Sequence, residues 1–154
     1  MRTFRTTLEH IRFNHPADGY AIAECAGTAF NPSRDISICR LRDDVRLGGV
    51  MFSNYTTESI AIHSGSWTEH WINRDMLFAT FDYPFKQLKV NRIFGYVPEN
   101  NLHAIQFNKN VGFTHVVTIP GMFEHGVACY LMKLEREDCR FLNVKPRGIY
   151  SNRH

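Results

Sequence analysis

The run from residue 92 to residue 113 has the residue types and spacing most able to support chemistry. Residues 93–97 form a short segment rich in aromatic and β-branched residues, which indicates a β-strand. Asn101 follows the Pro98 turn and can cap a helix, because its side-chain oxygen accepts a backbone N–H that the helix start leaves unpaired. Gly112 can end that helix. A capped helix start behind a strand offers N–H groups to a polar ligand.

The same residues resemble a known family. Asn101, Ala104 and the pair Gly112-Phe113 have the spacing of the fourth helix and following strand of the GNAT N-acetyltransferase superfamily. Residues 83–93 fit Tyr-x-Phe-x-x-Leu-x-x-x-Arg-Ile, which resembles the ribosomal-protein-acetyltransferase branch. The late run Glu-Asp-Cys-Arg-Phe-Leu also resembles the ending of small acetyltransferase-like proteins of tailed phages. The resemblance covers roughly residues 36–142.

Length and composition indicate a single globular domain. A chain of 154 residues can bury a real core, and 44% hydrophobic with 21% charged residues is an ordinary globular mixture. No apolar run approaches the roughly 18 residues of a membrane span, and the first residues lack the apolar middle of a signal peptide. We therefore expect a cytoplasmic protein without membrane contact, with one domain at residues 1–142 and a basic tail at residues 143–154.

Charge and potential metal ligands argue against two further classes of function. The net charge of +3 is too small to indicate nucleic-acid binding, although the chain after residue 139 has four basic residues and no acidic one. The four cysteines lie far apart without Cys-x-x-Cys, and the eight histidines include no His-x-x-x-His or His-Glu-x-x-His. We predict free thiols and no metal site.

The periodicity predicts the elements that would position these residues. Three strands joined by tight turns predict an antiparallel meander, followed by helix, strand, helix and two final strands. This order predicts a GNAT-like α+β or α/β fold, with a mixed, mostly antiparallel central sheet of about six or seven strands flanked by helices. The predicted strands are residues 36–41, 46–55, 59–64, 93–97, 114–119 and 128–134, and the predicted helices are 16–26, 73–88 and the one after Asn101.

Some local features leave alternatives open. Residues 8–13 fit either a helical turn or a strand, and Gly48-Gly49 fits either a bulge with close backbone approach or a plain bend. Pro84 lacks an N–H and should kink its helix or loosen the last turn. Residues 135–142 could form a short helix, and the tail should be extended unless a neighbouring segment orders it.

The GNAT resemblance implies acetyl-CoA as cofactor and a primary amine, on a protein or a small molecule, as acceptor. Residues 59–64 match the strand whose backbone N–H groups polarise the thioester carbonyl in the superfamily, so His63 is the candidate general base. Tyr96 is a candidate acid. Asn108 falls where a Tyr often protonates the sulfur, and since Asn cannot donate a proton in that way it would orient the thiol or a water. Packing or capping is the alternative role for each.

The same resemblance implies a cofactor site around the loop after that strand. The usual Gly-x-Gly falls at residues 69–71, which read Glu-His-Trp, so both glycines are missing and Glu69 places a negative charge beside the diphosphate. The amides of residues 71–74 and the Arg74 side chain could still bind phosphate, or the loop could have lost this role. The implied cofactor-binding residues are Ile62, His63, Ser64, His70, Trp71, Ile72, Asn73, Arg74, Asn101 and Asn108.

Two functions remain open at this point. The first is an acetyl-CoA-dependent N-acetyltransferase, with catalytic candidates His63, Asn108 and Tyr96. The second is a catalytically degenerate interaction protein on the same fold, for example a phage virion or host-binding component, which the Glu-His-Trp loop and the basic tail would suit. A homodimer is compatible with both, and the sequence does not identify the acceptor.

Overall fold

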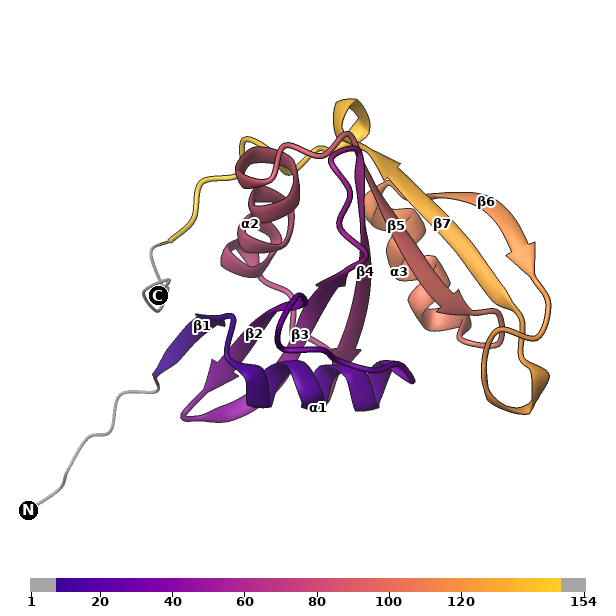
Figure 1. Cartoon of the computed structure of the whole chain (residues 1–154). Coiled ribbons are helices and arrows are strands. Elements are labelled where there is room, and N and C mark those ends of the chain that lie inside the picture. The colour runs from indigo at the N-terminus through magenta and orange to yellow at the C-terminus, as the bar shows by residue number, and fades with distance from the viewer. Residues whose placement is uncertain (1–7, 148–154) are drawn as a thin grey trace, which may run out of the picture.

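Seven strands form one continuous sheet in the computed structural model of the chain, which describes residues 8–147 (Figure 1). The strand order is β1-β2-β3-β4-β5-β7-β6, and only the β4–β5 pair is parallel. The prediction of a mixed, mostly antiparallel sheet of six or seven strands is confirmed. The strands are β1 Glu9–Phe13, β2 Ile36–Arg42, β3 Val45–Ser53, β4 Ser59–Ser66, β5 Arg92–Pro98, β6 Thr114–Ile119 and β7 Cys129–Glu135.

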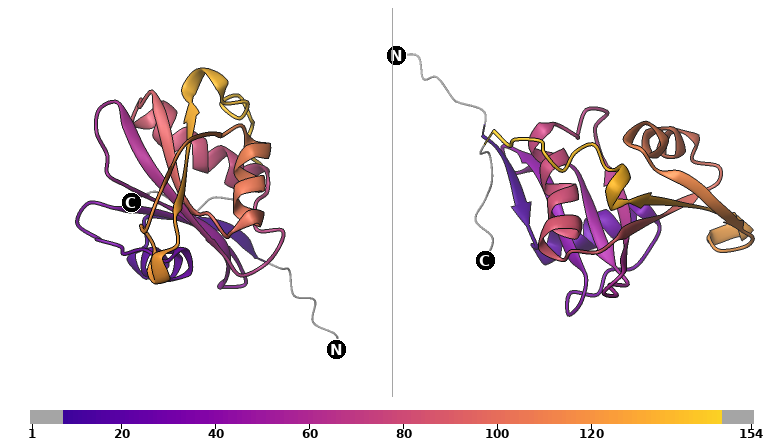
Figure 2. Two further views of the ribbon diagram at one scale, coloured as in Figure 1. Left: turned by 90° about the vertical axis from the view of Figure 1, so that its right-hand side faces the viewer. Right: turned by 90° about the horizontal axis from the view of Figure 1, so that it is seen from above.

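Three α-helices cover the two faces of this sheet. Helix α1 (Pro16–Ala26) packs on one face over β2, β3 and β4, whereas α2 (Arg74–Asp82) and α3 (Leu102–Val111) lie on the other (Figure 2). A π-helical turn η1 (Tyr83–Gln87) and two 3-10 turns, η2 (Glu124–Gly126) and η3 (Arg136–Asp138), complete the elements. None of the helices found between residues 8 and 147 is long and apolar enough to span a membrane.

Local signals explain where the helices begin and end. Helix α1 has Pro at its first position and ends at Gly27, whose φ of 75° is the left-handed conformation that favours glycine. Helix α3 is capped by the Asn101 side chain, which accepts a hydrogen bond from the Ala104 N–H at 3.1 Å, and it ends at Gly112 with φ 120°. Both predicted helices are confirmed, including their caps.

The predicted helix over residues 73–88 is divided in two. Its regular part ends at Asp82, and the chain continues in the π-helical turn around Pro84, where the Leu88 N–H donates to the Tyr83 carbonyl at 3.0 Å. Proline lacks an N–H and its ring crowds the preceding turn, so the wider turn accommodates it. The expectation that Pro84 loosens the last turn is confirmed.

The ends of the described chain resolve the remaining alternatives. Residues 8–13 contribute strand β1 rather than a helical turn. The helix expected over residues 135–142 is limited to the 3-10 turn η3. The Arg147 backbone N–H donates to the Asp75 carboxylate, so this part of the predicted tail is held against α2. Residues 148–154 of the tail lie outside the described residues.

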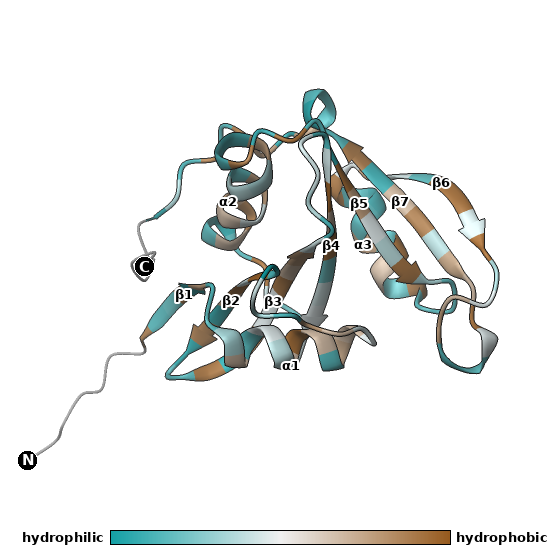
Figure 3. Cartoon of the chain, viewed as in Figure 1, coloured by the Kyte–Doolittle hydropathy of each residue, from teal (hydrophilic) through white to brown (hydrophobic). Residues whose placement is uncertain are grey.

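Hydrophobic residues are frequent along the strands (Figure 3), and the buried ones form two clusters, one on each face of the sheet. The larger cluster fills the space under α2 and α3, and the smaller one lies under α1. Gly48 belongs to the border of the larger cluster, because a Cβ atom there would lie 2.5 Å from Trp71 Cγ. A Cβ at Gly49 would lie 2.7 Å from the Ile38 carbonyl oxygen. Close approach therefore excludes a side chain at both glycines, and the strand register also shifts beside Gly48, between Arg40 and Leu41, as a bulge does.

Candidate active site

The site is a gap between the carboxyl ends of β4 and β5. The parallel pairing of these strands ends at Ile62 and Gly95. Beyond that point β4 stays paired with β3, through Val50 and Ser64, while β5 stays paired with β7, through Tyr96 and Leu131. The two strands therefore separate. The β4 edge that faces the gap carries backbone N–H and C=O groups without a β5 partner, which can hydrogen-bond a ligand.

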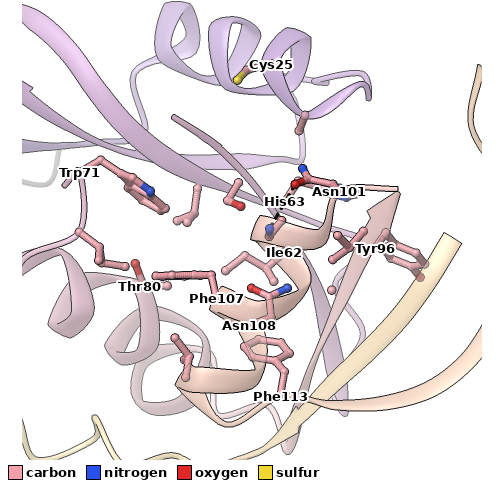
Figure 4. Close-up of a pocket in the computed structure, with 18 of the residues that line it drawn as sticks. Cys25, Ile62, His63, Trp71, Thr80, Tyr96, Asn101, Phe107, Asn108 and Phe113 are labelled. Atoms are coloured by element: carbon pink, nitrogen blue, oxygen red, sulfur yellow. Dashed lines mark hydrogen bonds between the residues drawn. The ribbon is translucent and has the colours of Figure 1, made fainter. Parts of the chain in front are cut away.

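A cavity of about 120 Å³ occupies the gap and extends between the sheet and helix α3 (Figure 4). A more open groove of about 300 Å³ lies at the start of α3. The two hollows lie side by side and share six lining residues, and we call the pair the channel; the shared residues are Cys25, Ser64, Trp71, Asn101, Ala104 and Phe107. The cavity is otherwise lined mainly by apolar side chains, whereas the groove is more polar.

His63 faces this gap from β4. Its Nε2 lies 3.3 Å from the Ser53 hydroxyl, and its ring stacks on Tyr96 with centroids 5.6 Å apart. Burial lowers the pKa of His63 below its ordinary value, and the negative charge of Asp35 opposes that shift only in part. The imidazole is therefore neutral at neutral pH and can accept a proton from an amine in the gap.

Two polar side chains enter the apolar part of the cavity from the helices. Asn108 projects from α3 toward β5, and its amide nitrogen lies 3.5 Å from where a Gly95 Cβ would be. The Thr80 hydroxyl of α2 is buried without a hydrogen-bond partner and lines the same cavity. A buried hydroxyl without a partner costs free energy, so this atom is free to bind a polar group in the cavity.

Comparisons with solved structures show to which fold this arrangement belongs. yncA from Salmonella typhimurium, described as an acetyltransferase with its cofactor acetyl-CoA, matches 82% of this chain and 93% of its own at 15% identity and a TM-score of 0.64. A mutant of the spermidine N-acetyltransferase SpeG from Vibrio cholerae matches 88% and 96% at 15% identity and a TM-score of 0.67. A GNAT-family acetyltransferase from Bacillus anthracis matches 84% and 96% at 14% identity and a TM-score of 0.60. The fold is that of the GNAT acetyltransferases. No protein-family model and no curated protein matches the sequence.

Within the GNAT fold, most of the predicted site residues meet at the gap. The structure brings together Ile62, His63, Ser64, Trp71, Ile72, Tyr96, Asn101 and Asn108, which all line the cavity. Their roles remain predictions. Asn101 also caps α3, so the capping role and a ligand-binding role fall on one residue.

Three predicted residues at the start of α2 and in the loop before it lie elsewhere. The His70 carbonyl accepts a hydrogen bond from Arg40 at 2.7 Å, and the Asn73 side chain accepts one from the Met76 N–H at 2.8 Å, which caps α2. Arg74 is exposed. None of the three lines the cavity or the groove. In this structure the loop therefore contributes mainly the Trp71 side chain, which packs on Gly48 and lies 6.1 Å from the Phe107 ring.

The channel fits the two ends of acetyl-CoA unequally. Its apolar part, the free edge of β4 and the unpaired Thr80 hydroxyl suit a thioester and its amide-containing arm. The groove that would receive the phosphates is lined by Glu69 and His103, and by no Lys or Arg from the part of the chain described. The described residues also contain no cluster of three or more potential metal ligands. Side-chain charge would therefore contribute little to holding a diphosphate in this groove.

Sequence reasoning missed several residues that shape the site. Ser53 and Thr80 belong to elements that only the fold brings to His63 or to the cavity, whereas Phe107 and Phe113 belong to the predicted α3 unit but are not among the predicted site residues. Gly95 alone could have been predicted from the sequence, because an isolated glycine within a strand often marks a place where another group approaches the backbone closely. It keeps the β5 side of the gap free of a side chain opposite Asn108.

Removing the cap of α3 tests the part of the site that the sequence predicted best. Asn101→Ala should lower the free energy of unfolding by about 1 kcal/mol, because the Ala104 N–H loses its acceptor. Urea unfolding measures this change. Asn100→Ala is the matched control, since that neighbouring residue is exposed and lies outside the cap and the cavity lining. Equal loss in both variants would mean that the cap contributes nothing specific.

Proposed function

We propose that this protein transfers an acetyl group from acetyl-CoA to a primary amine. The observation that carries the proposal is the gap between β4 and β5, which runs into a groove at the start of α3 and has His63 on its border. The GNAT fold supports the same activity, because solved acetyltransferases share it. The alternative of a degenerate interaction protein has no comparable structural feature in its favour.

The residues of the gap can perform the steps that such a transfer needs. Acetyl-CoA, when bound, supplies an activated acetyl thioester. Backbone N–H groups of β4 after Ile62 would polarise the thioester carbonyl, as preorganised donors in a water-poor site do effectively. His63 would accept the proton that the amine loses as the new C–N bond forms. The Tyr96 hydroxyl or a water would return a proton to the sulfur as the C–S bond breaks.

The polar residues of the cavity would position the cofactor rather than move protons. Asn108 has no proton to donate at neutral pH, but its amide can hydrogen-bond the arm that carries the thioester. Asn101 and the first turn of α3 would bind the same arm at the groove. Correct placement of the thioester against the amine is itself a large part of catalysis.

Isothermal titration with acetyl-CoA tests the proposal directly. We expect saturable one-to-one binding, because the adjoining groove and cavity together offer one site. Glu69→Gln should bind somewhat more tightly, since it removes the negative charge from the groove. If no binding is detected up to about millimolar concentration, the binding free energy is weaker than about 4 kcal/mol. That result would reject the acetyltransferase assignment and favour the interaction protein.

A further inference from the structure

A buried carboxylate outside the cavity lining has one oxygen without a partner. Asp35 directly precedes β2 and is only 3% exposed. Its Oδ2 atom accepts a hydrogen bond from the Asn31 N–H at 2.8 Å, whereas its Oδ1 atom is buried without a hydrogen-bond partner. Because such an oxygen costs free energy, holding the loop through Oδ2 does not account for the whole carboxylate.

The strand register places this carboxylate beside the polar partner of His63. Ile36 of β2 pairs with Phe52 of β3, and the same pairing continued by one residue places Asp35 opposite Ser53. The Ser53 hydroxyl in turn lies 3.3 Å from His63 Nε2. A carboxylate, a hydroxyl and an imidazole therefore follow one another across the ends of β2, β3 and β4.

The alternation of the strands puts all three side chains on one face of the sheet. Asp35 shares its alternation with Cys39, and Ser53 shares its alternation with Met51. Cys39 and Met51 both belong to the small cluster under α1. His63 pairs with Met51 and so points to the same face. We call Asp35, Ser53 and His63 the polar row.

Asp35 supplies the negative charge of this row. It partly opposes the lowering of the His63 pKa that burial causes. The other titratable residues that line the cavity with His63 are Cys25 of α1 and Tyr96 of β5, so the lining contains no Asp, Glu, Lys or Arg. Arg34 Nε lies 3.9 Å from Asp35 Oδ1, but its side chain is 72% exposed, so water screens its charge.

A hydroxyl between a carboxylate and an imidazole sets the tautomer of the imidazole. A carboxylate only accepts hydrogen bonds, so the single hydroxyl hydrogen of Ser53 would point toward Asp35. The Ser53 oxygen would then accept a hydrogen bond from the Nε2–H group of His63. This tautomer leaves the lone pair on Nδ1, to which no described residue hydrogen-bonds.

We propose that Asp35 is a positioning residue for the general base, which acts through the Ser53 hydroxyl to hold His63 in its Nε2–H tautomer. This inference rests on the proposed acetyltransferase function. The proton of the amine passes to Nδ1 as the C–N bond forms, and the charge of Asp35 stabilises the resulting imidazolium. Asp35 itself stays ionised throughout and touches neither the amine nor the thioester.

NMR titration of protein with isotope-labelled histidine tests the polar row without any substrate. The His63 signal is assigned by its absence in His63→Gln. We expect the Nε2–H tautomer in the wild type, and mixed tautomers with a titration at lower pH in Asp35→Asn, which lacks the charge that opposes burial. Asparagine keeps an oxygen for the Asn31 N–H. The same tautomer and the same titration in both proteins would overturn the proposal.

Acetyl transfer from acetyl-CoA to lysine amide, with CoA release as the readout, tests the consequence for the reaction. Asp35→Asn should lower kcat/KM at neutral pH by about 10-fold and move the acid limb of its pH profile to lower pH. Ser53→Ala should reproduce the loss, whereas Ser53→Thr, which keeps the hydroxyl, should retain most of the rate. The control is Asp44→Asn, an exposed acid in the turn after β2, which should change neither the rate nor the profile.

A double variant separates positioning from a structural role. If Asp35 acts through His63, Asp35→Asn should lower kcat/KM no further when His63→Gln is already present. A further loss in the double variant, or a lower rate in Asp35→Asn with an unmoved acid limb, would show a structural role and overturn the inference. Lack of acetyl-CoA binding by the wild type would instead reject the acetyltransferase assignment, and the NMR titration distinguishes the two failures.

Discussion

Asp18→Asn is expected to lower the free energy of unfolding by about 3 kcal/mol. The Asp18 carboxylate is fully buried and accepts hydrogen bonds from Arg12 Nε, Arg12 Nη2 and Arg46 Nε, each at 2.7 Å. Asparagine keeps the shape but removes the charge, so two guanidinium groups lose their counter-ion. Both arginines are partly exposed and can regain water, which keeps the loss at the lower end of the range for buried ion pairs.

The effect should depend on pH with a defined sign. Burial alone would raise the pKa of Asp18, but the hydrogen bonds from Arg12 and Arg46 outweigh it and hold the pKa below 3.8. A carboxylate with a lowered pKa contributes stability above its unfolded value and loses it as the pH falls through the folded value. The difference between Asp18→Asn and the wild type should therefore be complete at pH 7 and shrink below about pH 3.8.

Urea unfolding at pH 7 and at a pH well below 3.8 measures the prediction. Glu24→Gln is the matched control, because Glu24 is an exposed acid on the same helix, and it should change stability by less than about 0.5 kcal/mol. A melting temperature lower by roughly 6–12 °C would agree with the expected loss for a domain of this size. If Asp18→Asn and Glu24→Gln unfold alike, the ion pairs do not hold α1 against β1 and β3.

The Asp18 cluster also shows why part of the fold was not predictable from the sequence. Arg12 and Arg46 lie 6 and 28 residues away from Asp18, on β1 and β3, and no periodicity relates three charged residues at such separations. The local elements were predictable because their signals are local. Asn101 and Gly112 cap one helix, and Pro16 and Gly27 mark the ends of another.

The candidate site divides in the same way. The α3 part was predictable, because Asn101 follows from its capping position and Asn108 is implied by the GNAT resemblance, and both line the cavity. Trp71, one of the implied cofactor-binding residues, lines the cavity, and its side chain is buried against Gly48 of β3. The sequence indicates that Gly48 is unusual, because it is a glycine within a strand. The residue that approaches it, Trp71, belongs to a distant loop. A single sequence does not reveal which large side chain fills the space that a missing Cβ leaves.

His63→Gln is expected to lower kcat/KM for acetyl transfer by about 100-fold or more. Glutamine can still hydrogen-bond Ser53 but cannot accept a proton, so the variant removes the proposed base with little change in packing. Burial holds the pKa of His63 below 6.5, partly opposed by Asp35. The wild type should therefore keep its neutral imidazole down to below pH 6.5 and lose activity as the pH falls further.

The ratio of wild-type to His63→Gln rates across pH isolates this residue, because the amine acceptor titrates identically in both. That ratio should be constant near neutral pH and fall toward one at low pH, where the wild-type imidazole is protonated. His15→Gln, at an exposed position before α1, should leave the rates unchanged. A ratio near one at all pH values would remove His63 as the base, and the amine proton would then pass to water from the same gap.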